Sequence, residues 1–305
     1  MSIPSTDTTR AATWKLLQPE TPHPVKSTLV PGDGNQGSDQ SIFDPDMRVP
    51  VNPADFRDGG KYRSIVKIQS RFEDQRSDQS VWMMGTGWLV SPDLLVTAGH
   101  VVYDWSHRLG ACTQMKCYIG YNGRDSVKSH QVQSRHGVDV VTTAEWVETD
   151  RNRTRDVAFV RLNRPFEGNL GTFRFETTPP SGDGINLGVV GYPGDRTLND
   201  EFGAQMYAEF ASTKYDLDES PRNLLDYQIS AFGGQTGAPI LRQDQGRLVP
   251  IGTHCYGDGD LCNSGTSIGN KHGNDYTSYI NLLHSPSDFG SQVNIVEVPS
   301  KREGV

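Results

Sequence analysis

Three short segments of the chain carry residues that could act together in acid–base and nucleophilic chemistry. His100 follows the small pair Ala98-Gly99, which would allow another backbone to approach closely. Asp156 opens an otherwise apolar run, where a buried carboxylate is costly unless a partner such as an imidazole N–H binds it. Thr236 lies among the glycines of residues 233–237, where a tight turn can aim two backbone N–H groups at the same point as a hydroxyl. Each residue alone also fits a structural role, so only their combination indicates catalysis.

The elements that must position these residues are short β-strands. Between residues 64 and 251, short β-rich runs are bounded by Gly, Pro, Asp or Asn. The chain has 32 Gly and 18 Pro among 305 residues, which suits many turns and few long helices. This pattern predicts an all-β sandwich or barrel, with a break between two sets of strands near residues 171–184. Residues 276–283 are predicted to form a short helix that docks on the body.

The two ends of the chain differ in composition from this body. Residues 1 to about 40 are rich in Ser, Thr, Pro, Gly and Asp, and they have too few large apolar side chains to offset the entropy of ordering. We interpret residues 1–43 as a tail or a propeptide. Residues 285–305 return to the same composition and are interpreted as a C-terminal tail.

Composition argues against two classes of partner. The chain has 29 Lys+Arg and 37 Asp+Glu, a formal net charge of −8, which is unlike a protein that coats nucleic acid. No apolar run approaches the roughly 20 residues needed to cross a bilayer. We therefore expect neither a nucleic-acid partner nor a membrane partner.

The four cysteines occur as two close pairs, Cys112 with Cys117 and Cys255 with Cys262. An even, locally paired count favours two small disulfide loops in an oxidising compartment, and four reduced thiols are the alternative. No secretory signal is visible at the start of the chain, so the compartment stays open. The cysteine spacing does not suit a zinc site, and no metal is assigned.

In the order His100, Asp156, Thr236, the three segments resemble the trypsin-like serine peptidases, and most closely their glutamyl endopeptidase (V8-like) branch. The matching motifs are a Thr-Ala-Gly-His element ending at His100, Asp-x-Ala starting at Asp156, and a Gly-x-x-Gly-x-Pro turn around Thr236. The resemblance implies an all-β fold of two six-stranded antiparallel barrels with a short C-terminal helix. Residues 44–176 would form the first barrel and residues 177–284 the second barrel and the helix, with the site between them.

In this family a hydroxyl attacks the scissile carbonyl, a histidine takes its proton, and an aspartate holds the imidazole tautomer. The resemblance makes Thr236 the nucleophile, His100 the general base and Asp156 its orienting partner, with the backbone N–H groups of Gly234 and Thr236 as the oxyanion hole. The family has serine where this chain has threonine, whose β-methyl restricts χ1 and occupies space beside the histidine or the oxyanion hole. The departure leaves two expectations open, a working enzyme and a disabled one.

The same resemblance suggests which residues select the substrate. His254 lies in a Gly-x-His segment similar to one that lines the primary pocket of the glutamyl branch and binds a Glu carboxylate, although a core histidine is the alternative. Ser230 stands where trypsin-type enzymes carry the acidic floor of this pocket, which disfavours cleavage after Lys or Arg. The branch often has a hydroxyl residue where this chain has Ala231, and Ser230 or Thr253 would compensate.

The sequence therefore predicts an endopeptidase that cleaves after Glu or Asp by a hydroxyl–His–Asp triad, with no cofactor. The alternative is an inactive pseudopeptidase that binds a peptide or protein partner between the barrels. We expect a monomer whose partner is a protein or peptide substrate. The resemblance and the paired cysteines favour an extracellular location.

Overall fold

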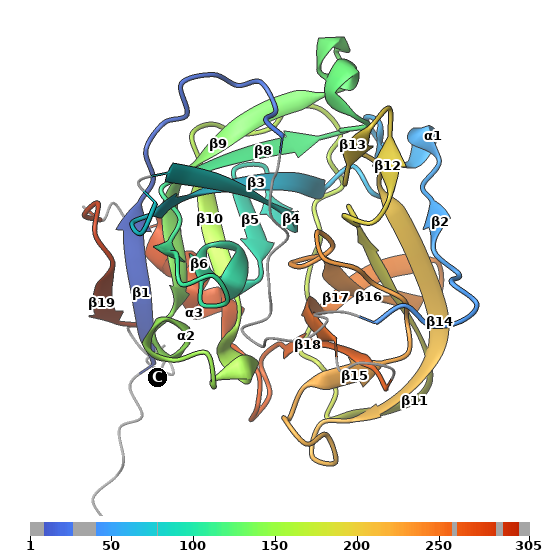
Figure 1. The fold of residues 1–305 in the computed structure, drawn as a ribbon. Coiled ribbons are helices and arrows are strands. Elements are labelled where there is room, and N and C mark those ends of the chain that lie inside the picture. The colour runs from blue at the N-terminus through green and yellow to red at the C-terminus, as the bar shows by residue number, and fades with distance from the viewer. Residues whose placement is uncertain (1–8, 27–40, 78, 258–260, 285–288, 299–305) are drawn as a thin grey trace, which may run out of the picture.

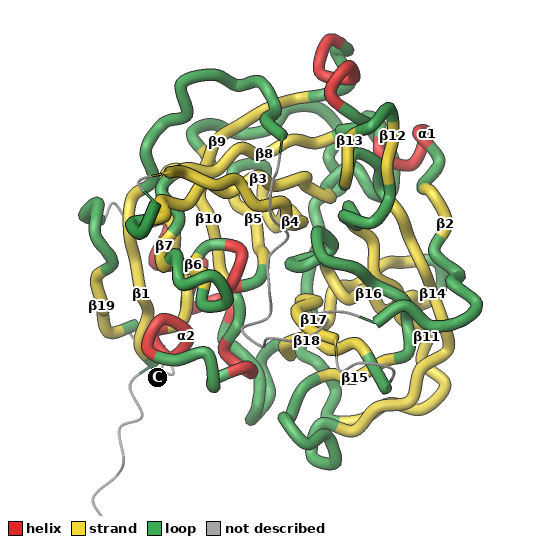
Figure 2. The backbone as a smooth tube through the Cα atoms, viewed as in Figure 1, coloured by secondary structure: helices red, strands yellow, loops and turns green. Residues whose placement is uncertain are grey.

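The computed structural model describes residues 9–26, 41–77, 79–257, 261–284 and 289–298. Within these ranges the chain forms two large β-sheets that curl side by side (Figure 1). Figure 2 shows that strands and loops make up most of both halves and that the helical segments are short.

The first sheet contains a closed barrel. Its strand order is β10-β5-β4-β3-β8-β9-β1-β19, and an additional pairing of β10 with β9 closes a ring of six strands. These six are β3 (Ile65–Asp74), β4 (Gln79–Ser91), β5 (Leu94–Thr97), β8 (Gln114–Ile119), β9 (Gln133–Thr143) and β10 (Ala158–Leu162). Their inward side chains, such as Val66, Ile68, Leu95 and Val160, are fully or almost fully buried in one core cluster. β-Branched and aliphatic residues suit this pleated, enclosed surface.

The second sheet curls into a half-barrel. It has seven strands in the order β15-β18-β17-β16-β11-β14-β2. They are β2 (Val49–Pro50), β11 (Ser181–Gly191), β14 (Tyr207–Asp216), β15 (Leu225–Tyr227), β16 (Pro239–Asp244), β17 (Arg247–Gly257) and β18 (Asn263–Ser267). The prediction of a two-barrel, all-β fold is confirmed, with the second barrel open rather than closed among the described residues.

The remaining elements are short. Two small hairpins pair β6 (Tyr103–Asp104) with β7 (Gly110–Ala111), and β12 (Thr197–Leu198) with β13 (Glu201–Phe202). The helices are α1 (Pro53–Phe56), α2 (Ala144–Glu148) and α3 (Tyr276–His284), with 3₁₀ turns at Gly99–Val101, Arg124–Lys128 and Arg153–Arg155. None of the described helices has the length and apolar character that a membrane span requires.

The expected C-terminal helix is present as α3, and it docks on the first barrel. Tyr276 and Tyr279 pack against Phe159 of β10, with ring centroids 5.0 and 5.5 Å apart. The helix follows the second sheet in the chain, so this contact ties the two halves together. Aromatic pairs at such distances add to the stabilisation from apolar burial.

The N-terminal segment is not a tail throughout. Residues Arg10–Lys15 form β1, which pairs with β9 on one side and with β19 (Asn294–Glu297) on the other. The side chain of Trp14 is buried, and its Nε1 donates to the carbonyl oxygen of Cys112 at 3.1 Å. The expectation that the N-terminal segment buries little surface is therefore wrong for β1, whereas β19 pairs with β1 at the edge of the barrel but stays largely exposed.

The prediction of two disulfides is also wrong, because all four cysteines are unbridged thiols. Gly257 of β17 pairs with Asn263 of β18. Cys255 lies two residues before Gly257, and Cys262 lies on the other side of this pair, so the two cysteines are offset by at least two residues along the strands. With a rise of about 3.3 Å per residue and about 4.8 Å between strands, their Cα atoms are further apart than the roughly 7 Å that a disulfide allows. Cys112 and Cys117 are buried in the first barrel, where desolvation raises the pKa of both thiols and disfavours the thiolate that disulfide formation requires.

Candidate active site

His100 and Asp156 meet at the end of the first barrel. β5 and β10 run antiparallel with Thr97 opposite Ala158, so the residues that follow β5 lie beside those that precede β10. The backbone N–H of His100 donates to Asp156 Oδ1 at 2.8 Å, and Nδ1 of the same residue lies 2.5 Å from Oδ2. Both side chains are buried, so the carboxylate orients the imidazole with little competition from water.

The glycine before His100 is required by this close approach. A Cβ atom at Gly99 would lie 2.8 Å from Asp156 Oδ1 and 2.9 Å from a ring carbon of Trp146. Contacts this short would push the carboxylate away from the imidazole. Gly99 therefore allows the close approach to His100 that the sequence predicted.

Tyr256 is a further partner of this pair that sequence reasoning missed. Its hydroxyl donates to Asp156 Oδ2, and its ring stacks on the His100 imidazole with centroids 5.8 Å apart and an interplanar angle of 20°. Burial, followed by the charge of Asp156, raises the pKa of Tyr256 well above its usual value, so the hydroxyl keeps its proton and remains a donor. Tyr256 lies two residues after His254 in β17, which was the only signal available in the sequence.

Thr236 lies in a glycine turn that presses against the segment carrying His100. Gly237 adopts a φ of +90°, and a Cβ atom there would lie 2.1 Å from Thr97 Oγ1 and 3.0 Å from the Ala98 nitrogen. The carbonyl oxygen of Thr236 accepts a hydrogen bond from the Thr86 N–H at 2.9 Å. The turn that precedes β16 is thereby held against β4 and against the end of β5, which leads to His100.

The backbone before Thr236 forms a tight turn at residues 232–235. The N–H of Gln235 donates to the Phe232 carbonyl at 2.9 Å, and Gly234 has a φ of +104°. A positive φ at the third position is the requirement of a type II turn, which glycine meets without strain. A Cβ atom at Gly234 would lie 2.5 Å from the Tyr192 carbonyl oxygen, so no other residue fits.

His254 adjoins the same turn. Its carbonyl accepts from the Gly237 N–H at 2.8 Å and its own N–H donates to Ala238 at 2.9 Å. The ring is fully buried, and Nδ1 lies 2.5 Å from the hydroxyl of Tyr227, a second residue that sequence reasoning missed. Burial, with a smaller contribution from the nearby His100, lowers the pKa of His254 to about 3, so the ring is neutral.

The other two pocket candidates have partners elsewhere. The hydroxyl of Ser230 accepts from the Phe43 N–H at 3.1 Å, and the Ser230 N–H donates to Glu209 Oε2 at 3.2 Å. Thr253 Oγ1 lies 2.7 Å from the hydroxyl of Tyr276 on α3. The side chain of Ser230 therefore contacts the segment at Phe43. The side chain of Thr253 contacts α3 and does not bind the His254 ring.

The main chain at Ser41 is bound next to these residues. Its N–H donates to Asn263 Oδ1 at 2.8 Å, and its carbonyl accepts from Asn263 Nδ2 at 2.7 Å and from the Ala231 N–H at 3.1 Å. His100 and Thr236 are 1% and 0% exposed. The catalytic candidates are therefore closed to solvent in this form of the chain.

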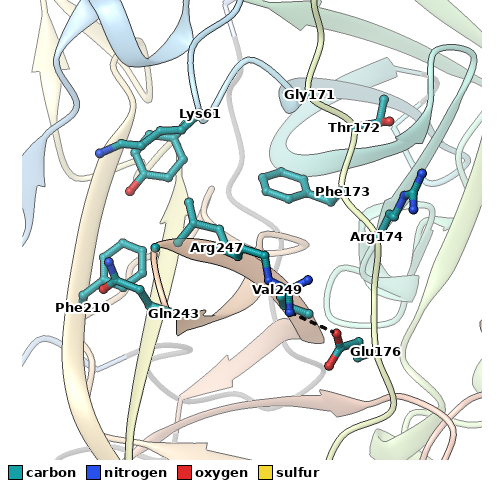
Figure 3. A pocket seen from close by; sticks show the side chains of 13 residues that line it. Lys61, Gly171, Thr172, Phe173, Arg174, Glu176, Phe210, Gln243, Arg247 and Val249 are labelled. Carbon is teal, nitrogen blue, oxygen red and sulfur yellow. Dashed lines mark ion pairs between the residues drawn. The ribbon is translucent and has the colours of Figure 1, made fainter.

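A separate pocket of about 900 Å³ lies away from these residues, between the linker at 171–176 and the β16–β17 hairpin (Figure 3). Phe173 and Phe210 face each other across it, and Glu176 pairs with Arg247 below (Figure 3). It contains none of the residues of the candidate triad. No group of three or more His, Cys, Asp or Glu side chains in the described ranges is placed to hold a metal ion.

Comparison with known proteins places this geometry in a family. The family described as the trypsin-like peptidase domain matches residues 85–251. Two curated relatives are the glutamyl endopeptidase of Bacillus licheniformis, 27% identical over 64% of this chain and 52% of the relative, and an extracellular metalloprotease of Bacillus subtilis, 28% identical over 68% of this chain and 61% of the relative. The chain spans less than two thirds of the length of either relative.

Solved structures share the fold. A Glu endopeptidase in complex with MPD superposes with a TM-score of 0.61 at 21% identity, over 80% of this chain and 99% of that one. The protease Anisep from Arthrobacter nicotinovorans gives a TM-score of 0.57 at 14% identity, over 77% and 98%. The family match spans more than half of the chain and includes both His100 and Thr236. The chain therefore belongs to the trypsin-like peptidase family.

Proposed function

We propose that the chain is an endopeptidase that cleaves after Glu or Asp with Thr236 as nucleophile. The observation that carries the proposal is the buried His100–Asp156 pair, 2.5 Å apart, beside a turn with positive φ at Gly234. A structural histidine needs neither this orienting carboxylate nor a glycine turn pressed against it. The family membership and the similarity to a glutamyl endopeptidase support the substrate class.

In the proposed reaction, Thr236 Oγ1 bonds to the scissile carbonyl carbon as its proton passes to His100 Nε2. The carbonyl π electrons move onto the oxygen, which accepts hydrogen bonds from the Gly234 and Thr236 N–H groups. His100 then gives the proton to the leaving amine as the C–N bond breaks. Water then attacks the ester carbon of the acyl-enzyme as His100 takes its proton. The proton returns to Thr236 as the ester bond breaks, and the fragment leaves with a new carboxyl group. Asp156 holds the imidazole through Nδ1 in both steps.

The role of Thr236 is tested by comparing the parent chain with Thr236→Ser and Thr236→Ala on a peptide with Glu before the scissile bond. Thr236→Ala is expected to abolish cleavage. Thr236→Ser is expected to raise kcat/KM by about 10²-fold, since the β-methyl restricts χ1 and a misplacement of about 1 Å costs roughly this factor. No cleavage by the parent or by Thr236→Ser across a broad peptide library would contradict the peptidase proposal.

A second candidate function is a binding module that holds a peptide without cleaving it. The full burial of Thr236, together with its replacement of the family serine, favours this alternative. Cleavage by Thr236→Ser alone would support it, because the scaffold would then be competent and the parent disabled. In that case Thr236→Ala should leave partner binding unchanged.

We also propose that the segment up to Ile42 is inhibitory. Two observations support this proposal: the main chain of Ser41 is bound to Asn263 and Ala231, next to the pocket candidate Ser230, and His100 is closed to solvent. A site-specific cut engineered at Ile42 is expected to raise kcat/KM about tenfold or more, if fewer than one molecule in ten is open beforehand. A cut is preferable to a deletion, because deletion would also remove β1. Unchanged activity and melting temperature after complete cutting would rule the idea out.

A further inference from the structure

The pair formed by Tyr227 and His254 has a chemical asymmetry that bears on substrate selection. His254 Nδ1 is bound to the Tyr227 hydroxyl at 2.5 Å, whereas the other ring nitrogen, Nε2, is buried and has no hydrogen-bond partner among the described residues. Buried polar groups are nearly always paired, so an orphaned ring nitrogen requires an explanation. The backbone of His254 is hydrogen-bonded to Gly237 and Ala238, which directly follow Thr236.

The proton positions follow from counting donors. Burial raises the pKa of Tyr227 well above its usual value and lowers that of His254 to about 3, so the phenol keeps its proton and the imidazole carries one. If Nδ1 donated to the phenol oxygen, the phenol hydrogen and the Nε2 lone pair would both lack partners. If the phenol donates to Nδ1, only the Nε2–H group lacks one. The second arrangement leaves fewer buried groups unsatisfied and is the favoured tautomer.

Both residues are held firmly in this arrangement. Tyr227 pairs across β15 and β18 with Asn263, whose side chain also binds the carbonyl of Ile229 at 2.7 Å. The backbone of His254 is fixed at both its N–H and its carbonyl. A rigid donor that is already desolvated gains more from an acceptor than a solvated one, because no water must be removed from it.

We propose that Tyr227 is the specificity-determining positioning residue of the pocket: it holds His254 as the Nε2–H tautomer, which leaves a donor for an oxygen of the acidic side chain before the scissile bond. The proposal rests on the proposed function for the identity of the substrate, but the tautomer itself does not depend on catalysis. A purely structural tyrosine would stabilise the fold without setting the ring proton.

The first test reads the tautomer directly by NMR of the ¹⁵N-histidine-labelled full chain, with His254 assigned from a His254→Gln variant. The parent is expected to carry the proton on Nε2, and Tyr227→Phe is expected to shift it wholly or partly to Nδ1. The matched control is Tyr215→Phe, which removes a partly buried hydroxyl of the second sheet, bound to the Pro179 carbonyl at 3.2 Å. A proton on Nδ1 in the parent, or an unchanged tautomer in Tyr227→Phe, would overturn the proposal.

The second test uses whichever of the parent and Thr236→Ser cleaves faster. Tyr227→Phe is expected to lower the ratio of kcat/KM for Glu over Leu before the scissile bond by about 10- to 100-fold, mainly through KM, because the lost hydrogen bond is to a charged group. Tyr215→Phe should leave this ratio unchanged, and an unchanged ratio in Tyr227→Phe would also overturn the proposal. If neither background cleaves any peptide, the proposed function fails, while the NMR result still decides the role of Tyr227.

Discussion

Replacing His100 with alanine is expected to lower kcat/KM on a Glu-containing peptide by about 10²–10⁴-fold. A positioned general base contributes roughly this factor, and His100 is the residue whose imidazole Asp156 orients. The measurement is made in the parent or in Thr236→Ser, whichever cleaves faster. Because Tyr256 and Asp156 remain in place, the fold should be retained.

The chain offers a matched control for this experiment. His272 and Asp218 form a second histidine–aspartate pair, 2.7 Å apart, on the surface of the second half. His272→Ala should leave kcat/KM within about twofold, as surface substitutions away from a site usually do little. Equal losses in the two variants would mean that the His100 effect comes from charge or folding, and a His100→Ala variant with full activity would remove the triad as the mechanism.

Replacing Trp14 with alanine is expected to lower the free energy of unfolding by about 3–5 kcal/mol. Trp14 is 1% exposed, packs into the core of the first barrel, and binds the Cys112 carbonyl through Nε1. Truncation leaves a cavity and an unpaired carbonyl. Urea denaturation followed by circular dichroism measures the change.

The control for Trp14 lies three residues away. Leu17 is 60% exposed, so Leu17→Ala should change the unfolding free energy by less than about 0.5 kcal/mol. A loss below about 1 kcal/mol in Trp14→Ala would mean that β1 is not part of the cooperative unit. Such a result would also indicate that the whole segment up to Ile42, including β1, can be deleted without unfolding the barrel.

Local patterns were sufficient for the fold class. Short runs of β-branched residues bounded by turn formers predict strands, and the helix at Tyr276–His284 was expected within one residue of its observed end. The candidate triad also follows from local motifs, which contain the glycines that its geometry needs: Gly99 leaves room for the Asp156 carboxylate, and Gly234 has a φ of +104°. These signals are readable because each depends on a few consecutive residues.

The strands at the two ends were missed because their stability is not local. β1 is a short run in a polar segment. Its partners β9 and β19 lie more than a hundred residues away in the chain, and the core that buries Trp14 is also built from distant segments. The disulfide prediction failed for a related reason. Closeness in sequence suggested bridges, but the extended β17–β18 hairpin separates Cys255 from Cys262.

Residue types and order were enough to predict a triad of His100, Asp156 and Thr236, because a family motif records which groups must meet. The hydroxyl groups that bind Asp156 and His254 belong to residues distant in the chain and could be found only in the folded structure. Tyr256 reaches Asp156 across 100 positions and Tyr227 reaches His254 across 27. Whether a buried hydroxyl donates to a carboxylate or to a ring nitrogen depends on which atoms lie within about 3 Å, and that is a property of tertiary packing rather than of any one segment.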